Sequence, residues 1–381
     1  MKKLIYLVLV LSLFFYCGPK QDKVEKFMED GVLHIKNPEK PLRGEVILEI
    51  EKTLEINPYQ FEEVGMRTFT FARDTDGEVI LFNHNIVEAQ RFNRDGEYMG
   101  NLVRKGQGPG EFTDMGGFSV CFMNNQIWAT GNFKLAKYDK IGRFLNERKL
   151  GYLPQVFVDE NTFFISKMER NEEEWLEKVS LVNLSLDKDG ESSIVGFFQE
   201  ENLGMIQSKD RRSVFMDSWG TPHIYSVYNQ ENQKLYVGLN TEYKIYVKNL
   251  KGETMHVIER PYKNVKVNLD DKKELLSREL RNESSMWMLS VYPDTLVAIK
   301  DIKILPNGYL AVYRVSDVST FEIDVFDPEG KYTYVIKKPE GISLDQAQFF
   351  SDGFATIGTT EDGFQIYLEY KIKNLPEVFR N

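Results

Sequence analysis

The chain has little cysteine, little histidine and no excess of positive charge, and each shortage excludes a class of protein. Its 381 residues include 2 Cys and 4 His, with 48 Lys+Arg against 58 Asp+Glu. The two cysteines, Cys17 and Cys121, can build neither a disulfide framework nor a cysteine-based zinc site. The formal net charge of -10 and the absence of a Lys/Arg-rich block argue against a nucleic-acid partner.

Long hydrophobic runs are also scarce, and the longest one stands at the N-terminus. Residues 4–16 are almost wholly apolar and follow Lys2 and Lys3, but they are shorter than the roughly 20 residues that a membrane-spanning helix needs. This pattern predicts a secretory signal peptide over residues 1–16. Cys17 comes directly after it, which resembles the signal of bacterial lipoproteins, whose cysteine is acylated and becomes the mature N-terminus.

Tyr16 stands where a lipoprotein signal has a small residue, so ordinary secretion with cleavage elsewhere is the alternative. We expect residues 17–43 to be a lipidated cysteine and a polar tether, and residues 44–381 to be the folded domain. The lipid would be the membrane partner, because each buried CH₂ group contributes about 0.8 kcal/mol. The predicted location is the cell envelope, on the periplasmic or the surface side.

Beyond residue 44 the chain alternates apolar and polar residues with period 2, and two turn signals recur in alternation. The first signal occurs at residues 74–77, 124–125, 159–161, 229–232, 306–308 and 351–353. The second signal ends on Gly96, Gly142, Gly190, Gly252 and Gly330. Asn, Asp and Gly tolerate the positive φ of tight hairpins, so each unit contains four antiparallel strands. Units of this length are typical of a β-propeller.

There are six turns of the first kind and five of the second, so the sixth unit lacks its fourth strand. The unpaired strand at residues 45–50 is available, and we expect it to pair with residues 365–370. The predicted fold is therefore all-β: a six-bladed β-propeller of four-stranded antiparallel blades, with the last blade closed by the N-terminal strand. An open β-solenoid is the alternative, but paired hairpins of this length fit it poorly.

One helical insertion is predicted near residues 268–290. Asn268 is a suitable N-cap, and Asp270 and Asp271 follow it in the first turn, where the helix dipole favours acidic residues. Leu269 and Leu276 lie on one predicted face. The helix is expected to pack these leucines on the rim of the propeller, and a lid over the central opening is the second interpretation.

Residues 104–112 read RKGQGPGEF and follow a turn and an outer strand. This string resembles the hallmark of a bacterial family of lipoprotein six-bladed β-propellers related to NHL-repeat propellers. The resemblance implies a propeller over roughly residues 44–375 and implies no established activity. The interblade loop motif consists of Gly106, Gln107, Gly108, Pro109, Gly110 and Glu111.

The composition of this loop has its own physical meaning. Three glycines and one proline within five residues cannot continue a strand ladder, so they make a tight passage between two blades. We expect Glu111 to accept hydrogen bonds from amides of the turn. The functional alternative is that the loop presents Arg104 or Glu111 to a ligand.

In such blades, the loops between second and third strands share one face with the links between blades. We call this the looped face, and the opposite one the hairpin face. Loops on a rigid scaffold commonly carry binding sites. The candidate ligand-face residues are His84, Arg104, Trp175, Trp287 and Arg314.

The sequence contains no catalytic set. The histidines form no zinc-type pair, and no Gly-x-Ser-x-Gly string is present. We therefore predict a membrane-tethered, non-catalytic propeller lipoprotein that binds an envelope protein or a glycan on its looped face, without a cofactor. The alternatives are a hydrolase or lyase that depends on a metal in the channel, such as Ca²⁺, and a purely structural envelope component. Three or more converging oxygen or histidine ligands in the channel would favour the enzyme.

Overall fold

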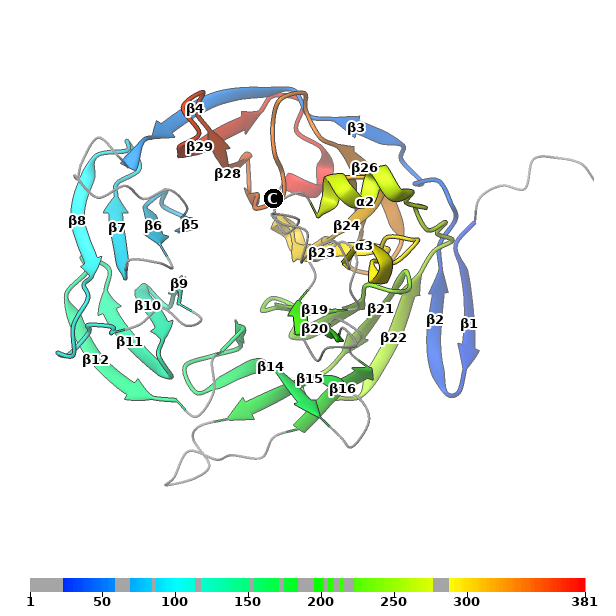
Figure 1. Cartoon of the computed structure of the whole chain (residues 1–381), viewed down its shortest axis with the longest axis horizontal. Coiled ribbons are helices and arrows are strands. Elements are labelled where there is room, and N and C mark those ends of the chain that lie inside the picture. The colour runs from blue at the N-terminus through cyan, green and yellow to red at the C-terminus, as the bar shows by residue number, and fades with distance from the viewer. Residues whose placement is uncertain are drawn as a thin grey trace, which may run out of the picture.

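The protein is a ring of six blades (Figure 1). The computed structural model describes residues 23–58, 69–83, 87–113, 118–150, 154–170, 175–183, 195–201, 205–207, 213–215, 223–276 and 288–380. Each blade contains a four-stranded antiparallel sheet, and successive blades follow one another round the ring. The predicted six-bladed β-propeller is confirmed.

In blades 1 to 5 the strand numbers rise from the centre of the ring outward (Figure 1). Blade 1 contains β5 (Thr70–Arg73), β6 (Val79–Asn83), β7 (Glu88–Phe92) and β8 (Tyr98–Val103). Blade 2 contains β9 (Ser119–Met123), β10 (Gln126–Gly131), β11 (Lys134–Asp139) and β12 (Phe144–Lys149). Blade 3 contains β13 (Val156–Phe157), β14 (Thr162–Arg170), β15 (Trp175–Asn183) and β16 (Val195–Glu201).

The second half of the ring repeats this plan. Blade 4 contains β19 (Ile224–Asn229), β20 (Lys234–Leu239), β21 (Lys244–Lys248) and β22 (Thr254–Glu259). Blade 5 contains β23 (Ile299–Ile304), β24 (Leu310–Asp317), β25 (Thr320–Phe326) and β26 (Tyr332–Lys337). Blade 6 contains β27 (Gln348–Phe350), β28 (Gly353–Thr359), β29 (Gln365–Ile372) and one N-terminal strand. A separate hairpin is formed by β17 (Met205–Gln207) and β18 (Ser213–Phe215), and short 3-10 turns lie at η3 (Pro306–Gly308) and η4 (Glu377–Phe379).

The hydrophobic core is divided among the six junctions between neighbouring blades. Successive side chains of a strand point to opposite faces of its sheet, so one strand serves two junctions. In β10, Ile127 and Ala129 pack toward blade 1, whereas Trp128 packs toward blade 3. The period-2 alternation of the sequence thus builds a cluster on each side of every blade.

The N-terminal part of the chain closes the ring, as predicted, but with a different segment. The strand that completes blade 6 is β4 (Ile50–Ile56), which pairs antiparallel with β29. We expected residues 45–50 to make this pairing, but the strand that does so begins only at Ile50. The first part of the expected segment forms β3 (Glu45–Ile47), which instead pairs parallel with β26 in blade 5. Leu48 lies between the two strands and is buried among residues of blades 5 and 6, which explains the strongly apolar pattern of this segment.

The prediction of a polar tether over residues 17–43 is wrong from residue 25 onward. There, β1 (Glu25–Glu29) and β2 (Val32–Lys36) form a hairpin, and β2 pairs parallel with β22 on the outside of blade 4. The strands β1 to β4 therefore run along the outer edges of three blades (Figure 1). We call residues 25–56 the N-terminal belt.

Asn37 fastens the belt at the junction of blades 4 and 5. Its side chain is buried, donates to the carbonyl of Gly330 at 2.9 Å and accepts from the amide of Tyr332 at 2.8 Å. The amide of Asn37 donates to the carbonyl of Glu259 at 2.8 Å. One residue of the belt thus satisfies backbone groups of two blades, as buried backbone groups require.

The predicted helical insertion is present between blades 4 and 5 as α2 (Leu269–Leu275) and α3 (Met288–Val291). Asn268 caps α2, and Asp271 completes a capping box. The inner side of α2 differs from the prediction. Leu276 is buried, but Leu269 is exposed, and Lys272 is buried instead because its ammonium donates to the carbonyl of Tyr292 at 2.7 Å. Within the described residues, no helix is long and apolar enough to cross a membrane.

Candidate functional site

The antiparallel order of the strands determines which side chains share a face. The turns that join the first to the second strand, and the third to the fourth, lie on the hairpin face, and all other connections lie on the looped face. Of the candidate residues, Cys17, His84 and Trp287 fall outside the described residues, and Trp175 is described only as the first backbone position of β15. The structure describes both the backbone and the side chain of Arg104 and of Arg314.

Arg314 lies at the junction of blades 4 and 5 and belongs to a buried ionic cluster. Its Nε donates to Asp324 Oδ2 at 3.0 Å, and its Nη2 contacts Glu322. Arg260, just after β22, donates from Nη1 to the same Asp324 oxygen at 2.6 Å. The structure therefore brings two arginines from neighbouring blades onto one carboxylate.

Two tyrosines complete the cluster around Asp324. Tyr243 donates to Oδ2 at 2.6 Å, and Tyr332 donates to Oδ1 at 2.8 Å. Asp324 has no exposed surface, and burial raises the pKa of Tyr243 well above its usual value. Four donors saturate this carboxylate, so it joins two blades and is closed to substrates. Arg314 is thus mainly a structural residue beneath the looped face.

The GQGPGEF loop connects blade 1 to blade 2 as expected. Glu111 accepts a hydrogen bond from the amide of Gly108 at 2.8 Å through Oε2. Gly106 lies against the same carboxylate, and a Cβ added there would come within 1.9 Å of Oε2. An alanine at position 106 would therefore have to displace the carboxylate that caps the turn.

The end of the loop is fastened to blade 2. The carbonyl of Gly110 accepts from the hydroxyl of Tyr138 at 2.6 Å, and its amide donates to Glu147 at 2.9 Å. Glu147 also pairs with Lys134 at 2.9 Å. These contacts give the motif a structural role at the blade junction, whereas the exposed Arg104 remains the part of this segment that is open to a partner.

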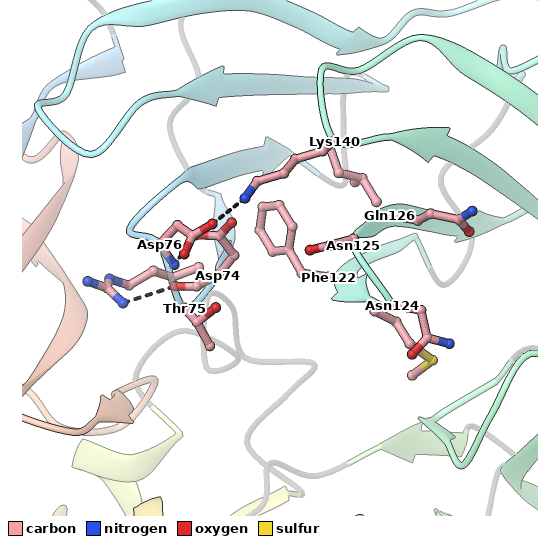
Figure 2. Close-up of a pocket in the computed structure, with 11 residues that line it drawn as sticks. Asp74, Thr75, Asp76, Phe122, Asn124, Asn125, Gln126 and Lys140 are labelled. Atoms are coloured by element: carbon pink, nitrogen blue, oxygen red, sulfur yellow. Dashed lines mark hydrogen bonds and ion pairs between the residues drawn. The ribbon is translucent and has the colours of Figure 1, made fainter.

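A pocket lies on the hairpin face between blades 1 and 2, where the sequence predicted only short connecting turns (Figure 2). Its volume is about 270 Å³. Blade 1 contributes the turn with Asp74, Thr75 and Asp76, and blade 2 contributes Phe122 and the turns that carry Asn125 and Lys140. We call it the hairpin-face pocket.

Hydrogen bonds within and between the turns hold the walls of this pocket in place. Asp74 Oδ1 accepts from the amides of Asp76 and Glu78, at 2.9 and 2.7 Å, so this DTDG segment is a hairpin turn, as predicted. Arg91, buried between the blades, donates to the carbonyl of Lys140 at 2.8 Å and pairs with Glu78. The two turns are therefore fixed relative to each other.

A second pocket, of about 340 Å³, lies where the innermost strands of blades 5, 6 and 1 meet. Its lining includes Phe71, Lys303 and Phe349. Burial lowers the pKa of Lys303. The ammonium of Lys303 donates to the carbonyls of Asp345 and Ala347, at 3.2 and 3.1 Å, so it is used to join blades 5 and 6. Among the described residues, no group of three or more His, Cys, Asp or Glu could hold a metal ion.

Comparisons with known proteins agree with this architecture. A family model described as a 6-bladed beta-propeller matches residues 71–238. The protein is a six-bladed β-propeller, and its predicted resemblance to such a family is confirmed in that respect. The lipoprotein and NHL-like parts of that resemblance remain predictions. No curated protein matches the chain.

Several solved structures are similar to the chain at low sequence identity. A member of the DUF4221 family from Bacteroides vulgatus is 12% identical, with a TM-score of 0.50, and the match covers 86% of this chain and 99% of that one. A candidate exported protein of Bacteroides fragilis is 15% identical, with a TM-score of 0.42, over 87% and 99%. Virginiamycin B lyase from Staphylococcus aureus is 11% identical, with a TM-score of 0.40, over 85% and 100%. At such identities the similarity concerns the fold alone.

Proposed function

We propose that this propeller is an exported, membrane-tethered binding module that takes a protein partner on its looped face. The observation that carries the proposal is the saturated Asp324 cluster beneath that face. Charged side chains there are used to hold loops and blades in place, which is how a preorganised recognition surface is built.

The helical insertion adds a raised, rigid element to the looped face. Its residues Leu276, Leu289 and Tyr292 form a small core together with Val315, near the looped-face end of β24. Lys272 joins both ends of the insertion through Tyr292 and Asp294. This packing supports rim attachment, the first interpretation of the helix, and it gives the face a fixed shape.

Apolar and cationic side chains stand exposed on this rigid surface. Phe133, in the turn between β10 and β11, is 57% exposed, and Leu269, at the start of α2, is 54% exposed. Arg104 is exposed on the link between blades 1 and 2. Aromatic and arginine side chains are enriched in protein interfaces, and the leucine adds apolar area beside them.

The position of β1 is compatible with a short tether. Because β22 ends at the looped face and β2 is parallel to it, the antiparallel β1 begins at the looped-face side of blade 4. Only residues 18–24 separate Cys17 from β1, a reach of at most roughly 30 Å. An acyl group on Cys17 would hold the rim of blade 4 near the bilayer. Mass spectrometry of the mature N-terminus tests this: an acylated Cys17 is expected, and an unmodified terminus elsewhere would refute the anchor.

Site-specific photocrosslinking tests the binding face. A photoreactive amino acid is placed at Phe133 or Leu269 in the full-length lipoprotein, and crosslinks are formed in native membranes. Met255, at the hairpin-face end of β22, is the matched control, because its 46% exposure is similar and it does not line the hairpin-face pocket. We expect the same protein adduct from Phe133 and Leu269 and none from Met255. Adducts from Met255 alone, or none from any position, would contradict the proposal.

A further inference from the structure

We propose that the hairpin-face pocket binds one neutral saccharide residue. The pocket is on the opposite side of the ring from the proposed protein-binding face, so the two proposals do not depend on each other. The inference rests on an aromatic ring, unpaired polar side chains and balanced charge, gathered in a cavity of about 270 Å³ (Figure 2).

Phe122 supplies the apolar surface. Its ring lies between Asp76 of blade 1 and Asn125 of blade 2, and it is only partly covered by the core of that junction (Figure 2). A saccharide ring presents C–H bonds on one face, and an aromatic side chain is the protein surface that packs best against such a face while leaving the hydroxyls at its edge free.

Polar groups stand around this ring. Within the part of the chain that the structure describes, the side chains of Thr75, Asn124 and Asn125 have no hydrogen-bond partner in the protein. A hydroxyl and two amides offer donors and acceptors together, and each sugar hydroxyl likewise donates and accepts. Asn124 and Asn125 both have positive φ, at 51° and 59°, so the turn that presents them has a defined shape.

The charges of the pocket favour a neutral ligand. Lys140 is paired with Asp76 across the pocket (Figure 2), and the ammonium lowers the pKa of that carboxyl, so both stay ionised at neutral pH. Arg73 is paired with Glu369 at 2.9 Å. No cation of the lining is therefore left for a phosphate, and each acid of the lining is engaged by a protein donor.

The size of the pocket limits the ligand to one ring. Pockets for drug-sized ligands begin at roughly 300 Å³, and this one is slightly smaller. Two of the three turns around it, those of Asp76 and Lys140, are fixed relative to each other, so little reorganisation of these turns is needed on binding. A terminal sugar of a glycan fits these limits, with the rest of the glycan extending into solvent.

Saturation-transfer NMR on the folded chain without its lipid tests the inference. The probes are glucose, galactose, mannose and N-acetylglucosamine, with inorganic phosphate and spermidine as charged probes. We expect at least one sugar to bind and both charged probes to fail. Phe122→Leu keeps an apolar side chain but removes the ring, and it should weaken binding roughly threefold to tenfold.

Asn125→Gly provides a second variant, because glycine keeps the positive φ and removes only the amide. It should weaken binding by a similar factor. Phe133→Ala, on the other face, is the control and should bind like the wild type. The inference would be overturned if no sugar bound, or if both pocket variants bound sugar as well as the wild type does. It would also be overturned if the control variant lost sugar binding, or if only a charged probe bound. None of these outcomes alters the crosslinks expected at Phe133 and Leu269.

Discussion

Asn37 should hold the N-terminal belt on the ring, and its replacement by alanine should release the belt locally. The substitution leaves the carbonyl of Gly330 and the amide of Tyr332 buried without partners. Each unsatisfied group costs roughly 1–3 kcal/mol, so we expect a loss of about 3 kcal/mol. A loss of that size makes opening of the belt roughly a hundredfold more favourable.

Hydrogen exchange followed by mass spectrometry measures this opening directly. Amides of β2 and β3 should exchange roughly a hundredfold faster in Asn37→Ala, while amides of β10 in blade 2 should keep their wild-type rates. Asn37→Asp keeps the shape of the side chain but removes the donor to Gly330, and it should behave like alanine.

Asn249→Ala is the matched control, because Asn249 caps a turn of blade 4 and its hydrogen bonds stay within that turn. Faster exchange in that variant should be confined to the turn. If Asn37→Ala left β2 and β3 protected as in the wild type, the belt would be held by its strand pairing alone, and the role assigned to Asn37 would be wrong.

Three other substitutions test the contacts that build the scaffold. Asp324→Asn should lower the free energy of unfolding by roughly 3–5 kcal/mol, because two partly buried guanidinium groups lose a fully buried carboxylate. Thermal melting measures this loss, and a loss no larger than that caused by Glu322→Gln, at a partly exposed position, would contradict the account. Gly106→Ala should displace the Glu111 carboxylate, so its cost should shrink by roughly 1 kcal/mol in a Glu111→Ala background; strict additivity would show that the two residues are independent. Burial, with Lys234 and Lys26 nearby, lowers the pKa of His256 to about 4 from 6.5. The unfolded chain therefore binds a proton at a higher pH than the native one, so stability is lost as the pH falls from 6.5 toward 4. Melting of His256→Gln should depend less on pH over that range, and an unchanged profile would rule out this histidine.

The periodic parts of the fold could be predicted because their signals are local. Turns such as residues 74–77 contain side chains that cap their own backbone, and strands such as β10 alternate because each faces two blade junctions. Both features follow from neighbouring residues, and they sufficed for the number of blades and for closure by the N-terminal chain.

The belt could not be predicted because its strands are short and depend on distant partners. The five residues of β1 are all exposed, so they show no apolar alternation. Only the pairing of β2 with β22, more than 200 residues later in the chain, places the β1–β2 hairpin on the ring. The closing strand was predicted several residues too early in the chain for the same reason. The most apolar run, around Leu48, passes between two blades, whereas β4 contains three exposed charged residues.

The hairpin-face pocket was missed for a related reason. Asp76 and Lys140 lie in two separate turns and Phe122 lies in strand β9, and each of these elements looks ordinary by itself. Only the placement of blade 1 beside blade 2 brings them together. Arg314 shows the converse. It was predicted as a ligand-face residue, but it lies within β24 and its charge is neutralised by Asp324.

The central claim, that a rigid propeller presents its looped face to a protein partner, is tested most directly by side-chain footprinting of the full-length lipoprotein. Labelling in native membranes is compared with labelling in vesicles of pure lipid. The account predicts that Phe133 and Leu269 lose reactivity only in native membranes, while Met255 on the hairpin-face side of blade 4 reacts equally in both. Protection at Met255 with unchanged labelling of Phe133 and Leu269 would contradict it.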